Sequence, residues 1–153
     1  MLMVKSNNIE DTKDVAKKLA RRILSDKTKR KSALVLALQG DLGSGKTTLT
    51  QSFAKALGVK EKITSPTFVL MKVYNLQLTT YSLRRFIHID CYRLNSPEEL
   101  EQLGFREILK DKDAIIIIEW AERVKKLLPK NTVWISFEYG DRQSERIIKF
   151  KTL

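Results

Sequence analysis

Three glycines, a lysine and two threonines lie close together in the segment GDLGSGKTT, residues 40–48. Its first eight residues match the pattern G-x-x-x-x-G-K-[ST], which ends here in Lys46 and Thr47. The glycines of this pattern let backbone N–H groups point inward, and the following helix start adds partial positive charge. The lysine can reach the β- and γ-phosphates of a nucleotide, and the threonine hydroxyl can bind Mg²⁺. The spacing therefore predicts a cradle for nucleotide phosphates.

The segments on either side favour this cradle over the alternative, a tight turn without chemistry. ALVLAL, residues 33–38, is a continuous apolar run typical of a buried parallel strand. Apolar residues then recur at helical spacing from Leu49 to Leu57, and Gly58 is expected to end that helix. Thr48 could also hydrogen-bond the α-phosphate. The expected nucleotide contacts in this segment are Asp41, Leu42, Gly43, Ser44, Gly45, Lys46, Thr47 and Thr48.

Two acidic residues end predicted strands and are candidates for positioning Mg²⁺. Glu119 ends AIIIIE, and Asp90 ends RFIHID. P-loop enzymes usually carry such a residue on a strand beside the P-loop strand. Glu119 ranks first because its strand is the more apolar, although Asp90 could instead cap the turn that follows it. The sequence does not separate direct ligation by Glu119 from ligation through water.

The segment TSPTF, residues 64–68, follows the P-loop helix, where many P-loop switch proteins sense the γ-phosphate. Pro66 restricts Ser65 to extended geometry. This geometry can present the hydroxyls of Ser65 and Thr67 toward a ligand. The alternative is a transition from loop to strand with capping hydroxyls.

Two further residues are expected to be structural. His88 is the only histidine, lies inside a predicted strand and should be a packed residue with a local hydrogen bond. Trp120 should point away from Glu119 if the strand continues regularly, so it is expected to fill core space.

The composition describes an ordinary globular chain. Its 153 residues favour a single domain spanning residues 1–153, with 42% hydrophobic and 31% charged residues. The opening residues make neither a signal peptide nor a membrane span. A single cysteine, Cys91, excludes an internal disulfide and suits a reducing compartment. We therefore expect a cytoplasmic protein.

The formal net charge of +11 is large for this length, and basic residues cluster at 27–31, 84–85 and 123–126. One interpretation is a lysine-rich solvated surface. The other is attraction to RNA or to an acidic protein partner. Aromatic residues are not interleaved with the clusters, so a dedicated single-strand binding surface is not indicated. Charge alone does not choose between RNA and protein.

The order of predicted elements indicates an α/β fold. An N-terminal amphipathic helix, capped by Asp11 or Thr12, precedes the P-loop strand. The segments after TSPTF and around RFIHID read as antiparallel strands, and Ser96 caps a helix at SPEELEQLG. AIIIIE reads as a second buried parallel strand, AERVKKLL as a short helix, and TVWISFEY with ERIIKF as a hairpin. We expect a P-loop fold with a mixed, mainly parallel central sheet, flanking helices and antiparallel strands at its edges.

Five motifs in order resemble the bacterial TsaE (YjeE) ATPases of tRNA threonylcarbamoyladenosine biosynthesis. They are GDLGSGKTT, SPTF, HIDCYRL, PEEL followed by LG, and IIIEWAER, and together they span residues 40–123. This combination is more specific than a P-loop alone. The chain departs from the pattern in NLQLTTYSLRR, which lengthens a connection, and in Cys91, whose position is more often aliphatic.

The resemblance implies an ATPase that holds Mg²⁺ with Thr47 and Glu119 and needs Asp90 near the γ-phosphate for hydrolysis. It places Ser65 to Thr67 in a switch and the nucleotide base near Thr12 and the loop around Arg142. It also implies that the chain acts with TsaD, which transfers threonylcarbamoyl to adenosine 37 of tRNA, and with TsaB. Whether tRNA contacts this chain stays open.

Three other functions compete with this interpretation. A small-molecule P-loop kinase would need an acceptor pocket and a lid, for which little length remains. A GTPase is disfavoured because no [NT]-K-x-D motif occurs. The third alternative is a non-enzymatic RNA-binding module in which the nucleotide only stabilises the fold. Such a module would not hydrolyse ATP, even with partner proteins present.

Overall fold

The computed structural model describes residues 2–26, 28–64, 69–77 and 83–151. Within these residues, seven strands form one sheet in the order β1-β7-β6-β2-β5-β4-β3. Strands β2, β4, β5 and β6 are parallel, whereas β1 and β3 pair antiparallel with β7 and β4, and β7 pairs antiparallel with β6. The predicted α/β class, with a mainly parallel centre and antiparallel edges, is confirmed. The strands are β1 (Leu2–Ser6), β2 (Leu34–Gln39), β3 (Met71–Asn75), β4 (Arg85–Asp90), β5 (Ala114–Glu119), β6 (Val133–Tyr139) and β7 (Arg146–Lys151).

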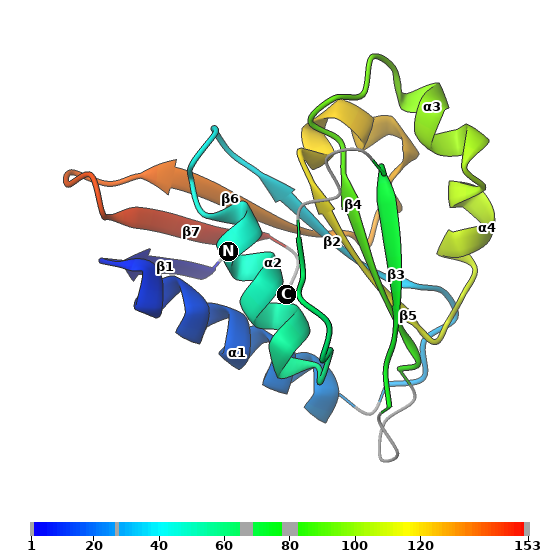
Figure 1. Cartoon of the computed structure of the whole chain (residues 1–153), viewed down its shortest axis with the longest axis horizontal. Helices are drawn as coiled ribbons and strands as arrows, with labels where there is room; N and C mark the ends of the chain where they lie inside the picture. Colours follow the sequence, from blue (N-terminus) through cyan, green and yellow to red (C-terminus); the bar gives the residue numbers. More distant parts are fainter. Residues whose placement is uncertain (1, 27, 65–68, 78–82, 152–153) are drawn as a thin grey trace.

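Helices cover both faces of this sheet (Figure 1). Helices α1 and α2 pack together on one face, and the shorter helices lie on the other. None of the helices in the described ranges is long and apolar enough to cross a membrane. The helices are α1 (Ile9–Ser25), α2 (Lys46–Ala56), α3 (Pro97–Gln102), α4 (Phe105–Leu109) and a 3₁₀ helix, η1 (Ala121–Leu127).

Burial on both faces explains the continuous apolar runs of the central strands. Along β5, Ile115 and Ile117 pack in the cluster under α1 and α2. Ile116 and Ile118 pack in the opposite cluster under α3, α4 and η1. All six residues of β5 are buried, which is the pattern of a parallel strand covered on both sides.

Several elements differ from the sequence-based expectation. Helix α1 begins at Ile9, and its cap is Asn8, whose side chain accepts a hydrogen bond from Asp11 N at 3.0 Å, so the predicted capping by Asp11 or Thr12 was wrong. Strand β1 and the five-residue helix α4 were not predicted. The predicted helix at AERVKKLL is a 3₁₀ helix. The Ser96 cap of α3 is confirmed, with Glu99 completing a capping box.

Candidate nucleotide-binding site

The P-loop lies between the end of β2 and the start of α2, as its sequence predicts. Gly45 precedes α2 with a φ of 105°, a left-handed conformation that favours glycine. Gly40 has a φ of 142°, and a Cβ there would lie 2.6 Å from the carbonyl oxygen of Phe137 on β6. The first glycine therefore allows close contact with the neighbouring strand, and the other sets the turn into the helix.

Lys46 is a buried cation inside this loop. Its Nζ donates to the carbonyl oxygens of Gly40 and Asp41 at 2.6 and 2.8 Å, and lies 4.0 Å from the centroid of the Trp120 ring. Burial lowers the pKa of the Lys46 ammonium, an effect that the carboxylate of Glu119 opposes. Among the described residues no carboxylate lies within ion-pair distance of Nζ. A buried positive charge without an ion-pair partner, beside backbone N–H groups, suits an anion such as phosphate.

A chain of three buried or half-buried polar groups adjoins this lysine. Thr47 Oγ1 donates to Glu119 Oε2 at 2.7 Å. The other carboxylate oxygen, Oε1, lies 2.9 Å from Nε2 of His88, and both side chains are almost fully buried. His88 is packed, as predicted, but its partner lies on the neighbouring strand rather than nearby in sequence. His88 Nδ1 has no partner among the described groups. Two contacts thus fix the orientation of the Glu119 carboxylate.

Asp90 and Glu119 end adjacent parallel strands and are partners in the β4–β5 register. Asp90 is half-buried, and its Oδ1 accepts a hydrogen bond from the backbone N–H of Tyr92 at 2.9 Å. It therefore does cap the following turn, the alternative that the sequence left open. Asp90 also lines the same cavity as Glu119, so the two candidate carboxylates lie together at the carboxyl edge of the sheet.

Trp120 packs against the core as expected, but it is only partly buried and also lines the cavity. The strand ends at Glu119, and Trp120 takes a left-handed conformation with a φ of 58°, so the side chains no longer alternate. Its ring is half-buried, lies over Lys46 Nζ and contacts the ring of Tyr92 with centroids 4.9 Å apart. Both aromatic residues line the cavity. Their role was missed because strand periodicity does not show where a strand breaks.

The cavity in front of the P-loop has a volume of about 670 Å³. One wall consists of residues 42–48 with Asp90, Glu119 and Trp120. The lining also includes Arg93 and Leu94 from the loop before α3, Glu99 and Gln102 from α3, and Leu103 directly after it. Most of the predicted nucleotide contacts therefore share one cavity. Asp41 does not line it, although its carbonyl holds Lys46. The functional roles of these residues stay predictions.

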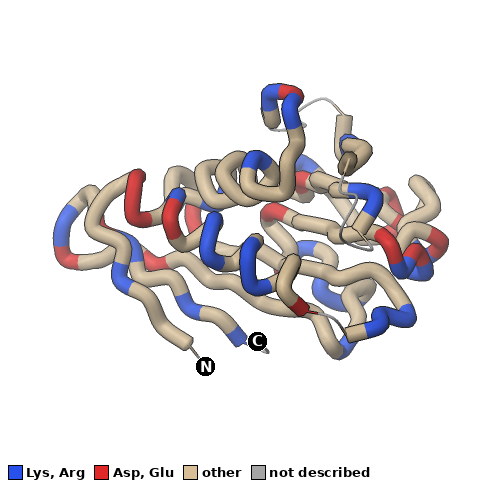
Figure 2. Tube along the Cα trace, turned by 90° about the horizontal axis from the view of Figure 1, so that it is seen from below, with Lys and Arg blue, Asp and Glu red and all other residues tan. Residues whose placement is uncertain are grey.

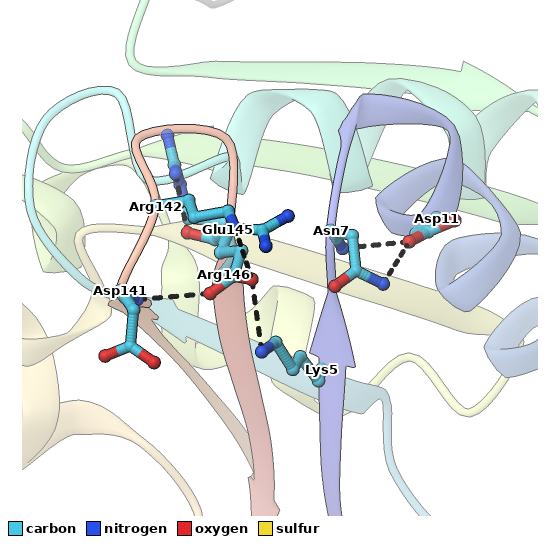
Figure 3. Close-up of polar contacts among 7 residues, drawn as sticks. All are labelled: Lys5, Asn7, Asp11, Asp141, Arg142, Glu145 and Arg146. Atoms are coloured by element: carbon cyan, nitrogen blue, oxygen red, sulfur yellow. Dashed lines mark hydrogen bonds and ion pairs between the residues drawn. The ribbon is translucent and has the colours of Figure 1, made fainter.

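The residues expected near the base lie on the other side of the P-loop. Thr12 is buried, and its hydroxyl lies 2.8 Å from Ser6 Oγ. Arg142 is 84% exposed on the β6–β7 hairpin, with its Nε 4.0 Å from Glu145 Oε1 (Figure 3). Neither residue lines the cavity, so base binding there stays a prediction. Ser65 and Thr67 lie outside the described residues.

The same hairpin holds the outer rim of the P-loop. Tyr139 Oη donates to the carbonyl oxygen of Leu42 at 2.6 Å, and Arg146 Nη2 donates to that of Gly43 at 3.1 Å. Figure 3 shows Arg146 beside Glu145, which accepts Lys5 Nζ from β1 at 3.1 Å. This contact with Lys5 lowers the pKa of the Glu145 carboxyl. Two side chains of the hairpin thus fix two carbonyls of the P-loop.

The sequence is similar to one described protein family. The family profile described as "Threonylcarbamoyl adenosine biosynthesis protein TsaE" matches residues 6–148. The TsaE protein of Haemophilus influenzae is 37% identical over 125 residues, which cover 82% of this chain and 74% of the relative. That of Bacillus subtilis is 35% identical over 139 residues, covering 90% and 78%.

A solved structure agrees with these relatives. The crystal structure of Bacillus subtilis YdiB superposes with a TM-score of 0.71 and 33% sequence identity. The superposition covers 97% of this chain and 83% of that chain. The sequence and the fold therefore point to the same family.

Proposed function

Because this chain belongs to the TsaE family of threonylcarbamoyl adenosine biosynthesis proteins, we propose that it is a Mg²⁺-dependent ATPase serving the threonylcarbamoylation of adenosine 37 in tRNA. The observation that carries the proposal is the 2.7 Å contact between Thr47 Oγ1 and Glu119 Oε2, beside the buried Lys46. A hydroxyl and a carboxylate at the start of the P-loop helix are the protein groups that Mg-nucleotide sites use.

The oxygen donors present fit Mg²⁺. No group of three or more histidine, cysteine or acidic side chains able to hold a metal occurs within the described ranges. Mg²⁺ does not need one, because it is typically held by one or two protein oxygens together with phosphate oxygens and water. Thr47 and Glu119 would hold it here, and when bound it would neutralise charge on the phosphates. The hydrogen bond from His88 would keep the carboxylate of Glu119 turned toward Thr47.

Other side chains of this protein would bind the phosphates, orient the attacking water and exclude bulk water. Lys46 and the N–H groups of residues 43–48 would bind the phosphates. Lys46 would then leave the carbonyl oxygens of Gly40 and Asp41, which it contacts in this structure. Asp90, at the end of the neighbouring strand, would orient the attacking water and accept its proton. The aromatic rings of Tyr92 and Trp120 would exclude bulk water from one side of the cavity.

As part of the same proposal, we assign TsaD and TsaB as the protein partners of this chain. Three large apolar side chains are exposed at the cavity: Leu42, Tyr92 and Leu103 are 70%, 44% and 47% exposed. They come from the P-loop, the β4–α3 connection and the end of α3. Exposed apolar side chains around a polar cavity are typical of a protein-protein contact. A partner seated there would close the ATP site against water.

A small-molecule kinase remains the alternative, because the cavity extends from the P-loop toward α3. Glu99, however, the carboxylate that lines that part of the cavity, already accepts the N–H groups of Asn95 and Ser96 with its Oε1. The products separate the two functions. An ATPase releases inorganic phosphate, whereas a kinase leaves the phosphoryl group on an added acceptor.

The metal role of Glu119 can be tested by Glu119→Gln, which keeps hydrogen-bonding atoms toward Thr47 and His88 but removes the charge. We expect the ATP affinity measured with Mg²⁺ to fall about 10- to 100-fold, the usual cost of losing a residue that supports a bound metal. The affinity measured with EDTA should hardly change. Titration calorimetry with and without Mg²⁺ measures both.

Glu122→Gln is the matched control, because Glu122 is exposed and lies on η1 only three residues further. It should bind Mg-ATP as the wild type does. If Glu119→Gln kept the full Mg²⁺-dependent gain in affinity, the metal would not be held at Glu119.

A further inference from the structure

The parallel strands give the molecule two ends with different chemistry. The P-loop, Asp90 and Glu119 lie at the carboxyl ends of the strands. The described residues of the connections at the opposite end are 26, 28–33, 57–62, 76–77, 83–84, 110–113 and 128–132, which we call the amino-end loops. Ala33 N donates to Leu109 O, at the end of α4 directly before loop 110–113, at 2.9 Å, and Arg84 N donates to Asp113 O at 2.8 Å. The amino-end loops thus share one end of the sheet, where the segments before β2, β5 and β4 are hydrogen-bonded neighbours, and together they form the surface considered below.

This surface is strongly basic. Its described residues include nine basic side chains and only four acidic ones, Asp26, Glu61, Asp111 and Asp113. Figure 2 shows the Cα trace from below the view of Figure 1, with lysines and arginines (blue) spread over much of the chain. The loops 40–45, 91–96 and 140–145 at the nucleotide end carry two basic and three acidic residues. The nine basic residues are Lys29, Arg30, Lys31, Lys60, Lys62, Arg84, Lys110, Lys112 and Lys130.

Much of this positive charge is not neutralised within the chain. Arg30 and Lys110 have carboxylate partners in Asp26 and Glu107. Asp111 pairs with Arg85 at the start of β4, so it does not offset a lysine of the loops. Within the described residues, six exposed lysines take part in no ion pair: Lys29, Lys31, Lys60, Lys62, Lys112 and Lys130.

The surface lacks the features of a protein interface. None of the large exposed hydrophobic residues lies in the described parts of the amino-end loops, whereas Leu42, Tyr92 and Leu103 surround the cavity at the other end. Protein interfaces have an apolar or aromatic centre, whereas nucleic-acid backbones are bound mainly by basic side chains. The described loop residues also expose no aromatic ring for stacking on single-stranded bases. The chemistry favours the phosphate backbone of a folded RNA.

We propose that the amino-end loops bind the phosphate backbone of structured RNA, at the end of the sheet opposite the nucleotide site. Strands lie about 4.8 Å apart, so the loops from β6 to β3 extend across roughly 20 Å, enough to face several phosphates. Recognition is by charge and shape, without readout of bases. That the RNA is tRNA rests on the proposed function; the phosphate-binding surface does not.

The test measures binding of fluorescent tRNA by anisotropy at increasing KCl concentration. One variant carries Lys31→Glu, Lys60→Glu and Lys112→Glu, from three different amino-end loops. The control carries Lys13→Glu, Lys18→Glu and Lys126→Glu, outside these loops, and changes the net charge by the same amount. Melting curves establish that both variants are folded. The comparison therefore isolates the position of the charge from its total.

We expect the amino-end variant to bind tRNA at least 30-fold more weakly than the wild type near 0.1 M KCl, and the control within about threefold. The slope of log affinity against log salt should fall by about two to three in the amino-end variant, because each lost phosphate contact removes nearly one. Equal weakening in the two variants would overturn the proposal. So would polyglutamate binding at the same surface as tightly as tRNA, which would indicate an acidic protein partner.

The Lys46→Ala variant separates this proposal from the proposed ATPase function. It should bind nucleotide about 100-fold more weakly and still bind tRNA as the wild type does. If the amino-end variant kept wild-type tRNA binding while Lys46→Ala lost ATP binding, the RNA surface would be wrong and the ATP site would stand. If ATP failed to bind the wild type while the amino-end variant still bound tRNA more weakly than the control, the ATP site would be wrong and the RNA surface would stand.

Discussion

Hydrolysis of ATP by this chain is expected to accelerate by about 10³- to 10⁵-fold when TsaB and TsaD are added, the range that completing a phosphoryl-transfer site supplies in other P-loop proteins. The lone chain presents Lys46, Thr47, Asp90 and Glu119 in an open cavity. Such a site can hold phosphates while the charge that develops during transfer is poorly stabilised. A partner covering the exposed Leu42, Tyr92 and Leu103 would exclude water and fix the cationic Arg93 on the cavity wall.

Phosphate release at steady state, with and without the partners, measures this effect. Added salt should weaken association mainly by slowing the encounter, because the chain carries a net charge of +11. Full-speed turnover by the lone chain, unchanged by partners or tRNA, would make it a self-sufficient enzyme and would refute the regulated ATPase.

The second large effect is expected for Asp90→Ala. Partner-stimulated hydrolysis should fall about 10²- to 10⁴-fold, the usual contribution of a positioned general base. Binding of Mg-ATP should change little, because Thr47 and Glu119 rather than Asp90 are proposed to hold the metal. Single-turnover hydrolysis and equilibrium binding separate the two quantities.

Asp14→Ala provides the control, since Asp14 is exposed on α1 and does not line the cavity. It should hydrolyse ATP at the wild-type rate. If Asp90→Ala instead abolished the Mg²⁺ dependence of binding and left hydrolysis intact, the roles of Asp90 and Glu119 would be reversed.

The parts of the site that were predictable are those encoded by residues adjacent in sequence. Lys46 and Thr47 follow the loop that they complete, so strand, turn and helix could be read in order. That Asp90 lies beside Glu119 could also be inferred from the sequence, because the carboxyl ends of parallel strands lie at one edge of the sheet. The capping box at Ser96 and Glu99 was predictable for the same local reason.

The parts that were missed depend on contacts between distant segments or on a single backbone angle. Strand β1 has mostly exposed residues and forms only because β7 supplies its pairing partner. The hydrogen bond between His88 and Glu119 joins neighbouring strands 31 residues apart. Trp120 turns into the cavity because its φ of 58° ends the alternation of β5. No spacing in the sequence encodes that angle.

The central claim is that the P-loop binds the phosphates of ATP through Lys46. Titration calorimetry of Mg-ATP into the wild type, Lys46→Ala and Lys55→Ala tests it most directly. Lys55 is an exposed lysine in the last turn of the same helix and serves as the matched control. Melting curves without nucleotide should show that all three proteins are folded.

We predict one site in the wild type and in Lys55→Ala, and about 100-fold weaker binding in Lys46→Ala, because charge-assisted hydrogen bonds to phosphate are lost. Nucleotide should also raise the melting temperature of the wild type. At a hundredfold excess over the wild-type dissociation constant, it stabilises the wild type by about 2.7 kcal/mol. Lys46→Ala should lose most of that gain. Equal affinity of Lys46→Ala and the wild type for Mg-ATP, or no binding to the folded wild type, would contradict the account.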